Sequence, residues 1–219
     1  MSGLRRGLQR VRFALRFLQH GSRELGRVGG FRSGRGGASG FAGSHRSGLG
    51  IRCGAQSDDP WGEPTIHLAS ALELVASLPD ALPVVWKTNA HGTPESHALL
   101  DGVFDAWVAD LKFGNDDCAR RIARVERYCS TVHDNLRWAA GHTRLIVRHL
   151  LLPGHLDCCW RPAAAWLAEQ LPQAEVSLRT GFWPGWFSHR HPELKAPGPR
   201  SEAQEAVRIW VEAGLRLIE

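Results

Sequence analysis

From residue 61 onward, short apolar runs of strand length alternate regularly with longer segments whose apolar residues recur at helical spacing. The pattern predicts strands at residues 82–88, 104–111, 145–152, 176–179 and 215–218. It predicts helices over residues 66–78, 94–100, 116–125, 130–140, 158–171 and 202–213. Such alternation indicates an α/β fold with right-handed crossovers and a mostly parallel sheet, either open or curved into a barrel.

The first quarter of the chain has a different composition. Residues 1–52 hold 11 of the 27 basic residues and a single acid, Glu24, and all nine tryptophans lie beyond residue 60. Residues 26–50 are rich in glycine, serine and arginine and too poor in apolar residues to form a core. We therefore expect two parts: a disordered basic segment over residues 1–59 and a folded body over residues 60–219.

Three interpretations of the basic segment remain open. An arginine-rich leader with few acids is typical of an organelle transit segment. A Gly/Arg tract could hold single-stranded nucleic acid, although the segment has no motif for it and we regard this partner as disfavoured. The third interpretation is an unselected tail, or a stretch translated out of frame.

Cysteine content and hydropathy bear on location. Five cysteines are an odd and thinly spread set, which argues against a disulfide framework and favours the reducing cytoplasm. No stretch approaches the roughly 20 apolar residues that a membrane helix requires. We expect a cytoplasmic protein with no membrane partner.

Charged residues lie where the predicted strands end. Ligands of parallel α/β sheets bind at the carboxyl ends of the strands. Asp110 and Lys112 are two residues apart and share one side of their strand, and Arg148 is a cation in an otherwise aliphatic strand. These groups could grip a zwitterionic or polyhydroxylated ligand, or could form a self-satisfied polar layer.

Several of these runs resemble a known family. Residues 107–115 (WVADLKFGN), 144–155 (RLIVRHLLLPGH) and 176–186 (VSLRTGFWPGW), together with the Gly-Glu-Pro sequence at residues 62–64, are similar to radical S-adenosylmethionine proteins. The similarity is to the pyruvate formate-lyase-activating-enzyme type, and within it to uncharacterised relatives. It covers residues 60–219, the carboxyl-terminal portion of such a protein. The resemblance implies a partial, TIM-like (β/α) barrel that here lacks its first strands.

The resemblance also implies which residues bind which groups. Family members hold S-adenosylmethionine and a [4Fe–4S] cluster at the strand carboxyl ends. Gly62 and Glu63 would meet the methionine amino group, Asp110 and Lys112 the ribose and the methionine carboxylate, and Arg148 the same carboxylate. Asn89, at the end of a preceding strand, would approach the methionine moiety. The implied partners are an electron donor and a small-molecule or glycyl-radical-type protein substrate.

The sequence departs from the family at the iron–sulfur motif. The family ligates its cluster with Cys-x3-Cys-x2-Cys, and no trio among Cys53, Cys118, Cys129, Cys158 and Cys159 has that spacing. We therefore expect a truncated or inactive radical S-adenosylmethionine protein with no catalytic residue and no metal ligand. The alternative is a non-catalytic regulatory or interaction protein that retains part of the pocket.

The sequence holds one other local group of possible metal ligands. His155, Cys158 and Cys159 lie close together in the sequence, with His149 on the preceding strand. We expect the adjacent cysteines to point in different directions at a helix start, which would make them a poor chelate.

Overall fold

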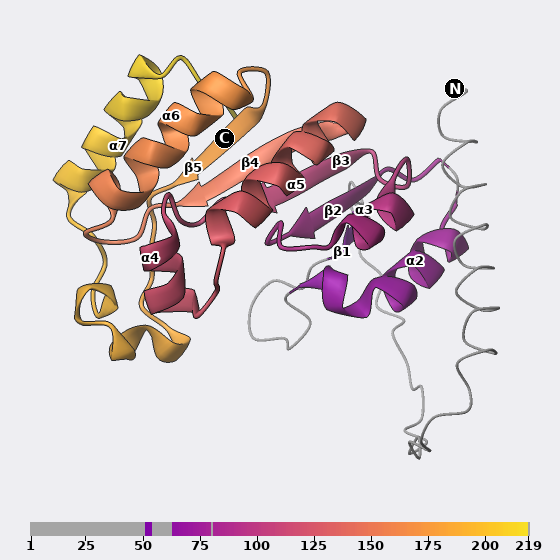
Figure 1. Cartoon of the computed structure of the whole chain (residues 1–219), viewed down its shortest axis with the longest axis horizontal. Coiled ribbons are helices and arrows are strands. Elements are labelled where there is room, and N and C mark those ends of the chain that lie inside the picture. The colour runs from indigo at the N-terminus through magenta and orange to yellow at the C-terminus, as the bar shows by residue number, and fades with distance from the viewer. Residues whose placement is uncertain (1–50, 54–62, 80, 219) are drawn as a thin grey trace, which may run out of the picture.

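The computed structural model describes residues 51–53, 63–79 and 81–218, and within them the chain builds one parallel sheet. The six strands lie side by side in the order in which they occur along the chain (Figure 1). They are β1 (Ile51–Cys53), β2 (Val84–Thr88), β3 (Ala106–Asp110), β4 (Arg144–Leu150), β5 (Glu175–Arg179) and β6 (Arg216–Leu217). This arrangement confirms the predicted α/β class with a mostly parallel sheet.

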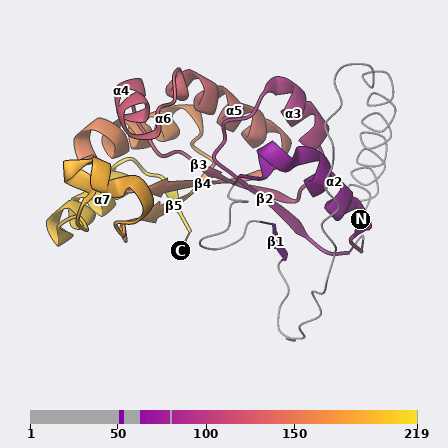
Figure 2. The same cartoon turned by 90° about the horizontal axis from the view of Figure 1, so that it is seen from below.

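Helical segments connect successive strands. The α-helices are α2 (Leu68–Ser77), α3 (Pro94–Leu100), α4 (Asp116–Cys118), α5 (Tyr128–His142), α6 (Arg161–Gln170) and α7 (Arg200–Glu212). Shorter turns are the 3-10 segments η1 (Pro64–His67), η4 (Trp186–Arg190) and η5 (Pro192–Leu194), and the π turns η2 (Ala119–Ala123) and η3 (Leu156–Trp160). Helices α2, α3, α5 and α6 lie along one side of the sheet, and the other side of β2–β4 carries no helix of the described chain (Figure 2).

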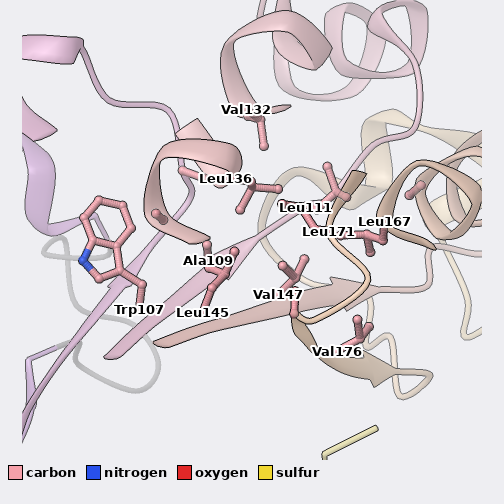
Figure 3. Close-up of a cluster of buried hydrophobic side chains, with 14 of the residues drawn as sticks. Trp107, Ala109, Leu111, Val132, Leu136, Leu145, Val147, Leu167, Leu171 and Val176 are labelled. Atoms are coloured by element: carbon pink, nitrogen blue, oxygen red, sulfur yellow. The ribbon is translucent and has the colours of Figure 1, made fainter. Parts of the chain in front are cut away.

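The side chains of each strand alternate between these two sides. Trp107 and Ala109 on β3 and Leu145 and Val147 on β4 are buried, and they pack toward α5 and α6 (Figure 3). Because successive residues of a strand point to opposite faces, residues 106, 108 and 110 and residues 144, 146 and 148 face the side without helices. The polar residues Asp110 and Arg148 therefore share that side.

Local sequence signals explain where the helices begin. Thr93 caps α3 by accepting a hydrogen bond from the Ser96 N–H (3.3 Å) through its hydroxyl, and Pro94 occupies the first turn. Asn115 caps α4 in the same way, accepting from the Cys118 N–H (2.8 Å). Both caps satisfy backbone donors that a helix start would otherwise leave unpaired.

Strand β1 was not predicted. Its residues fall in the segment that we expected to be disordered, yet they pair in parallel with β2, Ile51 opposite Val84. Residues 1–50 and 54–59 lie outside the described residues, so disorder there remains a prediction.

Two predicted helices also differ from the structure in form. The stretch 116–125 is a short α-turn followed by η2, and the stretch 158–171 begins as η3. Among the described residues, no helix combines the length and the hydropathy that crossing a membrane requires.

Candidate ligand site and cysteine cluster at the carboxyl edge of the sheet

Three of the predicted site residues form one charged cluster. Asp110 and Arg148 are partners in the register of β3 and β4, at the carboxyl ends of both strands. Arg148 donates to the Asp110 carboxylate twice, from Nε to Oδ1 (2.5 Å) and from Nη2 to Oδ2 (2.8 Å). Lys112 Nζ lies 3.4 Å from the same Oδ2. The structure thus brings together the three charges that the sequence placed at this edge.

The exposure of the three side chains shows how the cluster is layered. The Asp110 side chain is 10% exposed, whereas those of Arg148 and Lys112 are 30% and 48% exposed. A guanidinium carries five N–H donors, and the pair with Asp110 uses two of them. The cluster of one carboxylate and two cations carries a net positive charge, and both cations are partly exposed to solvent. Such a surface can bind an anionic group.

The backbone that follows β3 is fixed by a buried phenol. The Tyr128 hydroxyl accepts a hydrogen bond from the Lys112 N–H (2.7 Å). Burial raises the pKa of Tyr128 strongly, and the nearby Asp110 carboxylate adds to this rise against the opposing effect of the backbone N–H groups of Lys112 and Phe113. Tyr128 is therefore protonated at neutral pH and serves as a neutral anchor for the Lys112 backbone.

Glu63 lies at the carboxyl end of the neighbouring strand β2. Its Oε1 accepts from the Thr65 N–H (3.1 Å), the Thr65 hydroxyl (2.6 Å) and the Thr88 hydroxyl (2.9 Å). Its Oε2 accepts from the Asn89 N–H (2.6 Å). A carboxylate offers about four acceptor sites, two on each oxygen, so Oε2 retains capacity for one further donor. The carboxylate is thus held rigidly at the sheet edge.

Asn89 shapes the loop after β2. Its side-chain oxygen accepts from the His91 N–H (2.8 Å), and Ala90 between them adopts a left-handed conformation with φ 59°. The buried Asn135 of α5 donates to the carbonyls of Ala90 (2.8 Å) and Gly92 (2.9 Å). The structure places Asn89 beside Glu63, whereas Gly62 lies outside the described residues.

A second group of side chains at this edge joins Cys118, which the sequence analysis missed, to the three possible ligands that lie close together in the sequence. Cys118, His155, Cys158 and Cys159 each bring one possible ligand atom to a common centre, and these atoms all lie within 4.8 Å of one another. The expectation that the adjacent cysteines diverge is wrong, because the π turn η3 sets the two sulfurs 3.9 Å apart.

Cys118 comes from another loop, the one after β3, and His149 is not part of the group. His149 is buried on β4, where its Nδ1 lies 2.6 Å from the Leu111 carbonyl oxygen. The carboxyl ends of parallel neighbouring strands meet at one edge, so the chain segments after β3 and β4 could have been searched together for ligands.

This group does not fit the iron–sulfur cluster that the resemblance implies. Each protein ligand of a four-iron cluster binds a different iron, so those ligand atoms must lie further apart than atoms that share one ion. Here the sulfur–sulfur separations are 3.7 Å and 3.9 Å. The family's Cys-x3-Cys-x2-Cys spacing is also absent from the 219 residues. Accordingly, no step that requires a [4Fe–4S] cluster is assigned to these residues.

Comparisons with known proteins agree with the fold. No family model matches the sequence. An uncharacterised protein of Methanocaldococcus jannaschii is 32% identical over 157 residues, which cover 72% of this chain and 46% of that protein. The chain thus spans about half the length of the curated relative it matches.

Among solved structures, a domain of pyruvate-formate lyase-activating enzyme from Bacteroides vulgatus superposes with a TM-score of 0.58 at 16% identity. The match covers 72% of this chain and 93% of that domain. The protein therefore has the α/β fold of that domain.

Proposed function

We propose that this chain binds S-adenosylmethionine at the carboxyl edge of its sheet, as a radical S-adenosylmethionine-type protein related to pyruvate formate-lyase-activating enzymes. The observation that carries the proposal is the convergence of Asp110, Lys112 and Arg148 at the ends of β3 and β4, with both cations partly exposed. An amino-acid-like ligand presents a carboxylate to such a surface, and charge-assisted hydrogen bonds to it are among the strongest available.

In this proposal each charged residue has a complementary ligand group. Arg148 and Lys112 hold the methionine carboxylate, and Asp110 orients both cations while it offers an acceptor to the ribose hydroxyls. Glu63 meets the methionine amino group through the remaining capacity of Oε2, because its other acceptor sites are taken by Thr65, Thr88 and Asn89. Asn89 borders the same end of the ligand, and the role of Gly62, which lies outside the described residues, remains an expectation from the sequence.

The proposal is limited to binding. In the family, a bound [4Fe–4S] cluster supplies the electron that cleaves the sulfonium, and the cysteine group found among the described residues does not fit that cluster. The chain is either an inactive or partial form of such an enzyme, or a regulatory protein that binds the cofactor without cleaving it. An electron donor and a small-molecule or glycyl-radical-type protein substrate are partners only under the first alternative.

Isothermal titration calorimetry with S-adenosylmethionine tests the proposal. We expect wild-type protein to bind one equivalent and Arg148→Ala to bind about tenfold to a hundredfold more weakly, because it loses charge-assisted hydrogen bonds worth about 1.5–3 kcal/mol.

Arg144→Ala is the matched control. Arg144 lies on the same strand and the same side of the sheet but at the other end, where it pairs with Glu175 at 2.8 Å. Its removal should leave the affinity unchanged. No heat of binding with wild-type protein, or equal losses in both variants, would refute the proposed site.

A further inference from the structure

We propose that Cys118, His155, Cys158 and Cys159 bind a single tetrahedral metal ion, Zn²⁺ in the reduced protein, and so join the loops that follow β3 and β4. Cys118 ends α4, which follows β3, and the other three belong to η3 and the residue before it, which follow β4. The inference is independent of S-adenosylmethionine binding, since none of these side chains takes part in the proposed ligand site.

The distances between the ligand atoms match one tetrahedral ion. Zn–S bonds of about 2.3 Å and Zn–N bonds of about 2.0–2.1 Å place tetrahedral ligands about 3.8 Å apart for two sulfurs and about 3.5 Å apart for sulfur and nitrogen. Cys158 Sγ lies 3.7 Å from Cys118 Sγ and 3.9 Å from Cys159 Sγ. His155 Nδ1 lies 3.3 Å from Cys158 Sγ and 3.5 Å from Cys159 Sγ. Four of the six distances between ligand atoms thus match a zinc centre, and the two that involve Cys118 with Cys159 and with His155 are no longer than 4.8 Å.

The three thiols of the group influence one another's ionisation. Burial raises the pKa values of Cys158 and Cys159, and the charge of the neighbouring Cys118 thiolate raises both further. Burial also raises the pKa of Cys118, but hydrogen bonds from Asn115 and from the other two thiols outweigh it, so that its pKa is lowered overall. Zinc binds cysteine as the thiolate, and one divalent ion would compensate most of the negative charge that three thiolates bring together.

Residues around the four ligands hold them in place. Asn115 Nδ2 donates to the Cys158 carbonyl (2.6 Å) and lies 3.3 Å from Cys118 Sγ, while its oxygen caps α4. The Gly114 backbone hydrogen-bonds the Cys159 thiol. Hydrogen bonds to metal-bound thiolates fix ligand orientation and tune the site, and this loop provides them.

The histidine has a carboxylate on its far side. A histidine that ligates through Nδ1 carries its proton on Nε2. His155 Nε2 lies 3.7 Å from Glu193 Oε1 and 3.3 Å from Arg121 Nη2, so the carboxylate shares the far side of the ring with a guanidinium. Glu193 in turn pairs with Arg121, whose positive charge also acts on Cys118. A carboxylate behind a ligating imidazole is a recurrent arrangement in zinc sites. With four protein ligands the coordination shell is closed, which is the form of a structural site.

Metal analysis of the full chain purified in the presence of a thiol reductant tests this inference. We expect one zinc per chain, and an X-ray absorption spectrum that fits three sulfurs and one nitrogen. After zinc is exchanged for Co²⁺, thiolate-to-cobalt charge-transfer bands and the strong visible bands of a tetrahedral ion should appear. These readouts use wild-type protein and do not depend on whether a variant folds.

The variants Cys118→Ser and Cys158→Ser should reduce zinc to less than a quarter of an equivalent. Cys129→Ser is the matched control, because Cys129 is a partly buried cysteine of α5 outside the group, and it should retain one equivalent. Wild-type protein that carries no metal and gives no thiolate–cobalt bands would overturn the inference. So would a full equivalent retained by Cys118→Ser, or four irons with sulfide bound through these cysteines.

Discussion

Gly114 lies in the loop after β3, where that loop packs against the segment after β4. A Cβ atom at this position would lie 2.2 Å from the Cys159 carbonyl oxygen and 2.6 Å from Pro162 Cγ. The nearer of these atoms belongs to the backbone of η3, which cannot move aside as a flexible side chain would. Glycine is therefore required here by contact between the loops and not by backbone conformation.

Gly114→Ala should lower the free energy of unfolding by about 1–3 kcal/mol, because the added methyl group overpacks this contact. Gly141→Ala is the control. Gly141 lies in α5 with no atom within 4 Å of an added Cβ, and alanine should stabilise the helix there by about 0.5–1 kcal/mol. Urea unfolding measures both changes, and equal midpoints for the two variants would contradict this account of the contact.

Among the helices and strands, those with a clear local sequence pattern were predicted from the sequence. Helix α3 begins and ends at the predicted residues, because Thr93 and Pro94 mark its start, and β4 was placed within two residues at each end by its apolar run. Strand β1 was missed because it joins the sheet through backbone pairing, for which three residues leave no side-chain pattern. The π turn η3 was missed because residues 156–160 continue into α6 with an ordinary helical pattern.

The charged cluster of the candidate site was predicted from the sequence, whereas the complete cysteine group was not. The alternation of side chains predicted that Asp110 and Lys112 lie on one side of the sheet. Because the carboxyl ends of neighbouring parallel strands lie at one edge, Arg148 was expected near them, and the structure places it there. The cysteine group draws Cys118 and Cys158 from two loops that are 40 residues apart in sequence, so a search for spacing within one segment could not find it.

Strand β4 also carries a buried titratable residue, His149, which should make folding sensitive to acid. Burial lowers its pKa to about 4 from the ordinary value of 6.5, while the Leu111 carbonyl and Asp110 oppose that shift. As the pH falls from 6.5 toward 4, the unfolded chain takes up a proton that the folded chain does not. Stability from this residue is therefore present above pH 6.5 and is lost below it, by about 2 kcal/mol at pH 5.

His149→Gln should flatten the pH dependence by this amount, as measured by urea unfolding at pH 7.5 and pH 5. Burial also lowers the pKa values of three other histidines, His97, His133 and His155. The informative quantity is therefore the difference in the pH dependence of stability between the variant and the wild type. His91→Gln, at an exposed position, should retain the wild-type slope. An unchanged slope in His149→Gln would contradict the assignment.

In the whole molecule, the apolar core and the candidate ligand residues lie on opposite sides of the sheet. Helices α2, α3, α5 and α6 cover one side of the sheet and bury its apolar residues (Figures 2 and 3). By the alternation of side chains along β3 and β4, the charged residues Asp110 and Arg148 face the other side. The loops at the carboxyl edge then carry the candidate ligand groups and the cysteine group. The proposed metal would brace the two loops whose strands present the charged cluster, without contributing to the chemistry of the ligand.

In the proposed function, the charged cluster of Asp110, Lys112 and Arg148 recognises the amino-acid part of S-adenosylmethionine. The most direct test compares the affinity of wild-type protein for S-adenosylmethionine with its affinity for 5′-methylthioadenosine, which lacks the carboxylate and the amino group. We predict that wild-type protein prefers S-adenosylmethionine by at least about tenfold and that Arg148→Ala loses most of this preference. Equal affinity of the wild-type protein for both compounds, or a preference that persists in Arg148→Ala, would contradict the claim.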